Sequence, residues 1–403
     1  MSKTLQSGYV TTVAGNGEPG LTGDGAEATL ASLNEPKDVV FDQEGNLYVA
    51  DSENHVIRRI DRQSGMIQTF VGSPDEPDNK SDGPSAPNPQ NVQEEDVDPL
   101  ADFDDSPTKA YTQTPDLSGT VRYVVGKRVG ATRFGGDGEA ANHARLNFPS
   151  GIATDDQGAL YIADTWNHRI RRVDPLTGMI HTIAGTGQPK WTGDGGQAHS
   201  AALNEPVALV VDRKGKLYIA DQTNNRVRMI DTLTGVITTV AGTGEAEYNG
   251  DQIPATEAAL SGPSGLALDA QGNLYIADTF NGRIRKIDAE TGKIETVLGD
   301  GESFRYQPGY NDGSFSLARP YGIAFDRQGC LLITDSDNHL LRKWDPEAKK
   351  MSVIAGSGFA QYAGDEGPAE KSSLNFPFGV AVDGNGNIAL ADTFNHRIRM
   401  IRG

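Results

Sequence analysis

The 403-residue sequence predicts an all-β fold, a six-bladed β-propeller made of four-stranded antiparallel blades. Three observations predict it: a segment that recurs six times, a fixed spacing between its copies, and two chain ends that complement each other. The second copy reads Leu-Tyr-Ile-Ala-Asp-Thr-Trp-Asn-His-Arg-Ile-Arg and ends at Arg171. The aspartates of the copies number the blades 1 to 6 in chain order: Asp51, Asp164, Asp221, Asp278, Asp335 and Asp392.

The spacing indicates one structural unit per repeat. From Asp164 onward, consecutive aspartates are 57 residues apart, whereas the first two are 113 apart. The first interval therefore carries an insertion of about one repeat's length.

Each repeat contains four segments with the pattern of short strands. In blade 2 these are residues 149–155, 160–164, 169–174 and 179–185. They alternate β-branched or aromatic residues with others, and Gly, Asn and Asp turns separate them. Four strands at a fixed period predict propeller blades, because each small sheet must bury both faces against its neighbours.

The chain ends predict how the ring closes. The sequence stops at Gly403, after the third strand of blade 6, and starts with Tyr9-Val-Thr-Thr-Val-Ala-Gly15, which has the pattern of a fourth strand. We expect this N-terminal strand to complete the C-terminal blade. Residues 8–403 would then form a single propeller domain without an exposed sheet edge.

The repeats resemble those of a known family. Asn-His followed by Arg, Leu or Val, then an apolar residue and Arg, is similar to the NHL repeat. The connector Gly-Asp-Gly…Leu-Asn-x-Pro resembles the extended form found in bacterial and teneurin-like propellers, and the resemblance covers residues 8–72 and 121–403. It implies the propeller fold but no single activity, because NHL propellers include adaptors, ligand binders and enzymes.

An acidic, proline-rich insertion occupies residues 73–120. It contains twelve Asp or Glu, two Lys and eight Pro, a composition that cannot bury enough apolar surface to fold alone. We expect a flexible loop or a lid over the channel mouth that carries Phe103 and Tyr111. A calcium site is left open as an alternative, although the EF-hand spacing is absent. Its ligands would be five aspartates: Asp96, Asp98, Asp102, Asp104 and Asp105.

Two near-copies of the outer strand flank the insertion, at residues 67–72 and 121–126. Only one of them can be the regular fourth strand of blade 1. The other is expected to add a fifth strand or to lie across the face of the propeller.

Composition restricts the partners. A formal charge of −19 repels phosphate backbones, so nucleic-acid binding is disfavoured. The sequence shows neither a secretory signal nor a run of roughly 18 apolar residues that could span a membrane. It has one cysteine, Cys330, so it forms no internal disulfide. We expect a cytoplasmic monomer whose partner is a small molecule or a peptide.

Residues shared by all blades are expected to be structural. The repeated Asp and the Asn three residues after it are predicted to bond to turn backbone. Four histidines occupy equivalent positions of different blades, too far apart to share one ion whose ligands each lie at roughly 2 Å: His55, His168, His339 and His396. Neither a metal site nor a cofactor is predicted from these residues.

Departures from the repeat carry more information about function. Blade 1 has Lys37 and Asp38 where the other blades have small or apolar residues, and charges near a crowded axis are costly unless they are paired or used. The two form either a structural ion pair that plugs the channel or an acid/base pair, if burial moves their pKa values apart. Nearby segments contribute more side chains to the channel mouth: Glu35, Phe148, Glu205, Arg319, Tyr321, Phe376 and Phe378.

The turns between second and third strands also differ from blade to blade. Blades 2, 4 and 6 have Trp166, Phe280 and Phe394 at these turns, whereas blades 1, 3 and 5 have polar residues. Aromatic side chains at loop tips either stack on a ligand or pack against their own loop.

The sequence therefore predicts a propeller that recognises a small molecule or peptide at the mouth of its channel. The ligand-binding residues in this prediction are Arg319, Tyr321, Phe148, Phe376, Phe378, Trp166, Phe280 and Phe394. One alternative is a stand-alone lyase, hydrolase or cyclase in which Lys37, Asp38, Glu35 and Glu205 are catalytic. A second alternative is a protein-interaction scaffold that uses the outer faces.

Overall fold

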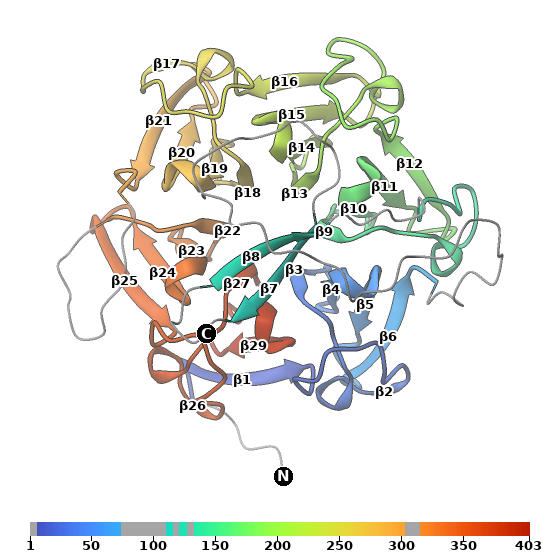
Figure 1. Cartoon of the computed structure of the whole chain (residues 1–403), viewed down its shortest axis with the longest axis vertical. Helices are drawn as coiled ribbons and strands as arrows, with labels where there is room; N and C mark the ends of the chain where they lie inside the picture. The colour runs from blue at the N-terminus through green and yellow to red at the C-terminus, as the bar shows by residue number, and fades with distance from the viewer. Residues whose placement is uncertain (1–5, 74–109, 116–120, 127–132, 303–314) are drawn as a thin grey trace, which may run out of the picture. The chain divides into compact units, whose positions relative to one another are not determined.

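The computed structural model describes residues 6–73, 110–115, 121–126, 133–302 and 315–403. The chain divides into two compact units, Met1–Pro74 with Phe134–Gly403 and Asp75–Arg133. In the first unit, six antiparallel sheets stand radially around a central axis (Figure 1). The predicted six-bladed β-propeller is confirmed.

Each blade has four main strands. In blades 1 to 5 the first strand in sequence is the innermost. In blade 6 the innermost strand is β27 (Pro377–Val382), and the N-terminal strand β1 (Tyr9–Ala14) lies outside β29 (Arg397–Ile401). Blades 1 to 3 consist of β3 (Pro36–Phe41), β4 (Leu47–Asp51), β5 (Val56–Ile60) and β6 (Met66–Val71); β9 (Pro149–Thr154), β10 (Leu160–Asp164), β11 (Arg169–Val173) and β12 (Ile180–Ala184); and β13 (Pro206–Val211), β14 (Lys216–Asp221), β15 (Arg226–Asp231) and β16 (Ile237–Ala241). Blades 4 to 6 consist of β18 (Pro263–Leu268), β19 (Leu274–Asp278), β20 (Arg283–Ile287) and β21 (Lys293–Leu298); β22 (Pro320–Phe325), β23 (Leu331–Asp335), β24 (Leu340–Asp345) and β25 (Lys350–Ala355); and β27 (Pro377–Val382), β28 (Ile388–Asp392), β29 (Arg397–Ile401) and β1 (Tyr9–Ala14). Short strands extend three blades at their outer edge: β2 (Ala26–Glu27), β17 (Ile253–Pro254) and β26 (Gly367–Pro368).

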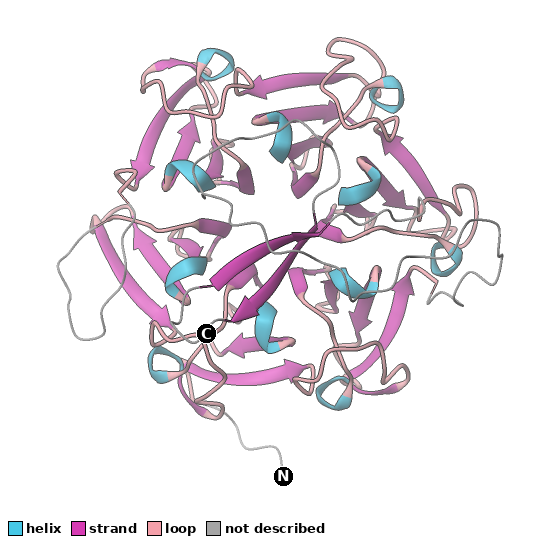
Figure 2. Cartoon of the chain, viewed as in Figure 1, coloured by secondary structure: helices cyan, strands magenta, loops and turns pink. Residues whose placement is uncertain are grey.

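Short 3-10 turns recur at two places in the repeat (Figure 2). One set follows the second strand of each blade: η2 (Ser52–Asn54), η4 (Thr165–Asn167), η6 (Gln222–Asn224), η8 (Thr279–Asn281), η9 (Ser336–Asn338) and η11 (Thr393–Asn395). The other lies in the connectors before the innermost strands: η1 (Ala28–Leu30), η3 (Ala141–His143), η5 (Ala198–Ser200), η7 (Ala255–Glu257) and η10 (Ala369–Lys371). None of the helices among the described residues has the length and apolar character needed to cross a membrane.

The innermost strands approach one another closely around the axis. A Cβ added at Gly265 would collide with the carbonyl oxygen of Tyr321 in the next blade, and one added at Gly151 with that of Val207. This explains why five blades carry Gly or Ala at this position. It also makes Asp38, the equivalent residue of blade 1, an exception.

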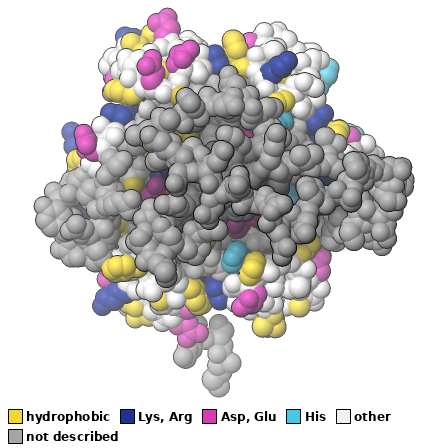
Figure 3. All heavy atoms as spheres, in the orientation of Figure 1, with side chains coloured by type: hydrophobic (Ala, Val, Ile, Leu, Met, Phe, Trp, Pro, Cys, Tyr) yellow, Lys and Arg dark blue, Asp and Glu magenta, His cyan; other side chains and the backbone are white. Residues whose placement is uncertain are grey.

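Apolar side chains fill the wedges between neighbouring blades. Tyr161 of blade 2 belongs to the same buried cluster as Leu209 and Ile219 of blade 3. Around the edge of the view in Figure 3, basic and acidic side chains lie beside one another. The apolar wedges hold the ring together by removing both faces of each sheet from water.

The ring closes through the N-terminal strand. β1 pairs antiparallel with β29, with Val10 opposite Ile401 and Thr12 opposite Arg399. The predicted completion of the C-terminal blade by the N-terminal strand is confirmed.

The second unit contains a two-stranded hairpin, formed by β7 (Ala110–Pro115) and β8 (Val121–Gly126). The fourth strand of blade 1 is β6, which comes from the first of the two near-copies. The second copy pairs with β7, so the alternative in which it adds a fifth strand to blade 1 is wrong; the fifth strand there is β2.

The lid and calcium predictions concern residues 74–109 and 116–120, which lie outside the described residues. Phe103 and the five candidate aspartates are among them, and Tyr111 lies in β7. Both predictions remain predictions.

Substitution of Val10 tests the closure. Its side chain is fully buried among residues of blades 5 and 6, so Val10→Asp should destabilise the propeller by about 3 kcal/mol or more in urea unfolding. Thr11→Asp, at the adjacent half-buried position, is the control and should cost less than about 1 kcal/mol. Equal losses in both variants would contradict a stabilising role for the buried face of β1.

Candidate functional site

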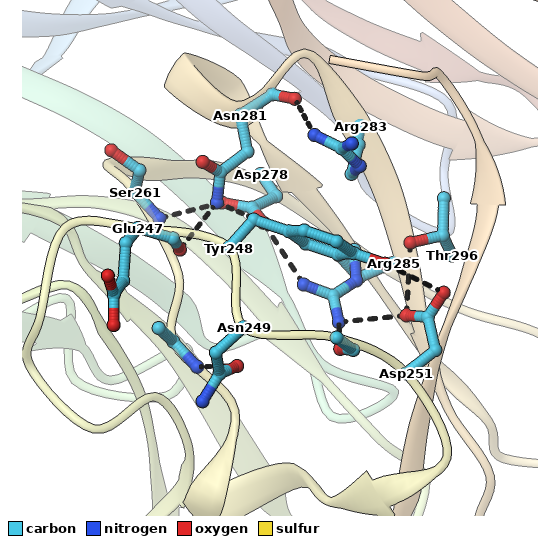
Figure 4. Close-up of polar contacts among 12 residues, drawn as sticks. Glu247, Tyr248, Asn249, Asp251, Ser261, Asp278, Asn281, Arg283, Arg285 and Thr296 are labelled. Carbon is cyan, nitrogen blue, oxygen red and sulfur yellow. Dashed lines mark hydrogen bonds and ion pairs between the residues drawn. The ribbon is translucent and has the colours of Figure 1, made fainter.

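A buried polar network holds the loops at one end of the propeller, and blade 4 shows it clearly (Figure 4). Asp278 Oδ1 accepts a hydrogen bond from the Ser261 backbone N–H at 2.7 Å. Its Oδ2 accepts from Asn281 Nδ2 at 2.8 Å and from Arg285 Nη1 at 3.3 Å. Arg285 Nη2 also donates to Asp251 in the connector, at 3.0 Å. One network therefore ties together two strands, a turn and a connector.

Equivalent contacts recur around the ring. The six repeat aspartates are fully buried, and each pairs with an arginine: Arg58, Arg171, Arg228, Arg285, Arg342 and Arg399. Burial raises the pKa of Asp164 to about 6, against the effect of Arg171, so the carboxylate is still ionised at neutral pH. The structural interpretation of the repeated Asp and Asn agrees with these contacts. The pairing of the motif's Arg with this Asp was not predicted from the sequence, although the Arg stands seven residues after the Asp in every blade.

Removing one charge of the buried network should be far more costly than removing an exposed one. Asp278→Asn leaves Arg285 buried without its carboxylate on the neighbouring strand, and we expect a loss of about 3–5 kcal/mol in unfolding free energy. Glu295→Gln breaks the partly exposed Lys286–Glu295 pair of the same blade, 3.4 Å apart, and should cost less than about 1 kcal/mol. Similar costs in urea unfolding would refute the central role of the network.

The repeat histidines join neighbouring blades. Nδ1 of His55 accepts the Phe148 backbone N–H of the next blade at 3.0 Å, and Nδ1 of His168 accepts that of Glu205 at 3.1 Å. His339 and His396 make the same contact with the following blades. The residues that donate these N–H groups have left-handed backbone, with φ of 52° at Phe148 and 51° at Glu205. Such backbone costs about 1 kcal/mol or more and persists only where surrounding contacts hold it.

Two blades depart from this arrangement. In blade 3, Asn225 Oδ1 accepts the Gly262 N–H at 2.9 Å in place of an imidazole. In blade 4, Gly282 has no side chain to offer, and Arg319 of blade 5 does not adopt the left-handed backbone. Arg319 instead lies with Nε 3.7 Å from Asp337 and its guanidinium 5.3 Å from the ring of Phe280.

The histidine contacts predict a loss of stability in acid. Burial lowers the pKa of His168 and His339 to about 4, from 6.5 in the unfolded chain. Between these two pH values the histidines are protonated in the unfolded chain but not in the folded one. Their contribution to the free energy of unfolding is therefore complete above about pH 6.5 and is lost as the pH falls toward 4.

Replacing both histidines by asparagine, the residue that blade 3 already uses, should reduce this acid loss, because the amide accepts the same bond without titrating. The midpoint of urea unfolding, followed from pH 7 to pH 4, is the measurement. His181→Asn, at an exposed position of β12, should leave the acid loss unchanged. An equally steep loss in the double variant would contradict the assignment.

Loop-tip residues at the channel mouth contact each other in pairs within a blade. The mouth is the end of the channel surrounded by the Asn-x-Pro segments and the second-to-third turns. In blade 2 the rings of Phe148 and Trp166 stack, with centroids 4.3 Å apart. In blade 6 the rings of Phe376 and Phe394 meet edge to face at 5.3 Å. In blade 3 the Thr223 hydroxyl donates to Glu205 at 2.8 Å.

Lys37 lies in a box of aromatic rings. Its Nζ is 4.5 Å from the ring centroid of Phe378, 5.1 Å from that of Phe394 and 5.7 Å from that of Phe148. The ammonium also donates to Glu35 Oε2 at 3.1 Å, and the side chain is only 10% exposed. Blades 6, 1 and 2 thus bring together six of the predicted residues: Glu35, Lys37, Phe148, Trp166, Phe378 and Phe394.

Asp38 is not the partner of Lys37, so the predicted Lys37–Asp38 ion pair is wrong. The Asp38 carboxylate accepts the backbone N–H groups of Val39 at 2.9 Å and Ile152 at 3.0 Å, whereas the Lys37 ammonium donates to Glu35. Burial raises the pKa of Asp38 to about 7 and lowers the pKa of Lys37, in the latter case against the carboxylate of Glu35. Because burial disfavours both charged forms, it moves the two pKa values toward each other and not apart.

A row of side chains crosses the mouth. The ring of Tyr321 in blade 5 stacks on that of Phe378 at 4.2 Å, and its hydroxyl lies near the Gln222 side chain of blade 3. Burial raises the pKa of Tyr321 to about 12, so the phenol is neutral. This contact joins two blades that are not neighbours.

Sequence reasoning missed Gln222. The other five blades have Ser or Thr at this position, and the hydroxyl donates to a carbonyl of the next blade, as Thr165 does to Pro206 at 2.7 Å. Blade 3 lacks this hydroxyl and directs an amide to Tyr321 instead. The departure from Ser or Thr in one repeat was the available signal.

A channel of about 340 Å³ runs between the innermost strands of the six blades. Its walls are mainly Val, Ile, Leu and Ala. The ionisable side chains among its lining residues are Lys37, Asp38 and Tyr321, all near the start of an innermost strand and therefore at the mouth. Glu205, Arg319 and Phe280 lie on blades 3 to 5 and are not among the lining residues.

The comparisons with known proteins agree with this architecture. The Teneurin NHL domain family matches residues 9–91, 130–192, 186–249 and 242–319. Protein SUPPRESSOR OF QUENCHING 1, chloroplastic, of Arabidopsis thaliana is 32% identical over 269 residues, which cover 64% of this chain and 25% of that protein. NHL repeat-containing protein 2 of Bos taurus is 28% identical over 315 residues, 70% of this chain and 42% of that protein. The chain thus spans less than half the length of these curated relatives.

A solved structure of low sequence identity shares the fold. The crystal structure of an auxiliary nutrient binding protein from Bacteroides thetaiotaomicron covers 97% of this chain and 75% of its own, with a TM-score of 0.58 and 15% identity. At that identity the likeness concerns the fold alone.

Proposed function

The chain belongs to the NHL-repeat β-propeller family, and we propose that it binds a small molecule whose apolar body lies in the central channel and whose polar end contacts Asp38 at the mouth. The observation that carries this proposal is a channel with apolar walls and with its ionisable groups gathered at one end. Small-molecule sites usually have this composition, with volumes of about 300–1,000 Å³ and a few polar groups that orient the ligand.

The mouth has a crowded side and an open side. At the position of Lys37, blades 5 and 6 carry Tyr321 and Phe378, whereas blades 2 to 4 carry Ser150, Val207 and Ser264. The large side chains and Lys37 contact one another, so we infer that the ligand lies beside the small ones. A ligand that enters past Ser150 would meet Asp38, whose carboxylate bonds to Ile152 in the same strand as Ser150.

The four residues considered catalytic have different partners. Glu35 bonds to Lys37, and Glu205 accepts the hydroxyl of Thr223. Asp38 is the member whose carboxylate lines the channel. This division supports binding as the function, with Asp38 as the residue that orients the ligand.

A neutral fluorescent probe can test the channel as a binding site. N-phenyl-naphthylamine should gain fluorescence on binding, and Ser150→Phe, which gives blade 2 the residue of blade 6, should weaken its affinity by about tenfold or more because the added ring fills the open side of the mouth. Ser150→Ala is the matched control and should change the affinity by less than about twofold. A folded Ser150→Phe variant, checked by thermal melting, that binds the probe as the natural chain does would refute the proposed site.

A further inference from the structure

The channel contains a carboxylate without a cationic partner. The oxygens of Asp38 accept two backbone N–H groups, and among the described residues neither Lys nor Arg lies within ion-pair distance of them. Apolar side chains of the innermost strands form most of the surrounding wall. A carboxylate in such surroundings is costly unless a positive charge compensates it, and a ligand can supply that charge.

The basic side chains at the mouth do not supply it. Lys37 donates to Glu35 and is enclosed by three rings, and Arg319 pairs with Asp337 on its own blade. Among the described residues, the Glu205 carboxylate accepts a neutral hydroxyl, that of Thr223. After these pairings the charge left at the mouth is negative.

The aromatic side chains at the mouth suit a cation as well. The ammonium of Lys37 already occupies the rings of Phe378, Phe394 and Phe148, so a ligand cation would use the ring of Tyr321. Tyr321 stacks on Phe378 and lines the channel next to this box. Carboxylate and ring faces together are the chemistry that recognises organic ammonium groups.

We propose that the polar end of the ligand is a primary or a quaternary ammonium group on an apolar body. This group pairs with the carboxylate of Asp38. This inference rests on the proposed binding of a small molecule in the channel and names its chemical class. The amine can belong to a free small molecule or to a side chain of a peptide, since both present the same group.

The proposed pairing couples binding to proton release. A cation favours the ionised carboxylate, and the pKa of Asp38 is about 7, so affinity should rise with pH through 7 and each binding event below that pH should release a proton. Other charged or titratable groups that face this region are Lys37 with Glu35 and Glu53 on one side, and Tyr321 with Arg319 and Glu205 on the other. Tyr321 remains a neutral phenol over the same pH range, because burial raises its pKa to about 12.

Three probes with the same alkyl body separate the charge from the channel. Octylamine, octanol and octanoate are titrated calorimetrically into the whole chain near pH 8, where the amine is charged and Asp38 is ionised. We expect octylamine to bind at least about tenfold more tightly than octanol, and octanoate most weakly. If octanol binds as tightly as octylamine, or if octanoate binds more tightly than octylamine, the ammonium inference is overturned and channel binding is left in place. Failure of all three to bind would overturn the proposed function itself.

A variant tests whether Asp38 provides the charge. Asp38→Gly gives blade 1 the residue that blades 2, 4, 5 and 6 carry at this position, so the ring is expected to accept it. The variant should bind octanol as the natural chain does and should lose the preference for octylamine. Proton release, measured below pH 7 in buffers of different ionisation enthalpy, should disappear with it. An unchanged preference or unchanged proton release in the variant would refute the role of Asp38.

To separate the two sources of the amine, a lysine-containing peptide and its acetyl-lysine counterpart are compared with octylamine as competitors for the neutral probe. Competition by octylamine alone supports a free small molecule, and competition by the lysine peptide but not by its acetylated form supports a peptide side chain. Equal competition by the acetylated form would contradict recognition of an ammonium.

Discussion

The pairing of a buried arginine with a buried aspartate constrains the loop end of every blade. Moving either charge out of water is unfavourable unless the other is in place, so the strands that carry them must keep one register. In blade 4 a second aspartate, Asp251, extends this requirement to the connector that arrives from the preceding blade. The same contacts therefore position the turns, the connectors and the start of the innermost strands, which are the segments that surround the channel.

Side chains outside this repeated framework can differ from blade to blade without disturbing it. Asp38 stands where close approach of the innermost strands favours Gly or Ala, and Gln222 stands where a hydroxyl normally joins two blades. Asp38 is larger than the Gly or Ala that the other blades have, and Gln222 lacks the hydroxyl that bonds to the next blade. Both lie at the channel mouth, together with Lys37 and Tyr321, and proteins depart from local structural rules mainly where function requires it.

Much of the fold could be predicted because periodicity reports contacts within a blade and between equivalent neighbours. The strand pattern, the number of blades and the pairing of β1 with β29 all follow from comparison of one repeat with the next. Several residues of the candidate site were also found this way, since Lys37 and Asp38 interrupt the pattern. The identity of their partners did not follow from the pattern.

The missing part depends on side-chain directions and on contacts across the axis. Lys37 reaches Glu35 and three rings from two other blades, whereas Asp38 turns to the backbone of blade 2. The Tyr321–Gln222 contact joins blades separated by a third one. No spacing in the sequence encodes such contacts, because the repeat period describes neighbours around the ring and not residues that face each other across it.

The closing strand has a mechanical consequence. β1 runs antiparallel to β29, and Val10 near the start of the one lies opposite Ile401 at the end of the other, so the chain leaves the sheet at the same end of both strands. A force that pulls the two termini apart would load the hydrogen bonds between these strands one after another and not all at once. Tension between the termini can therefore peel the propeller open at this junction, even though the same strands close the ring at rest.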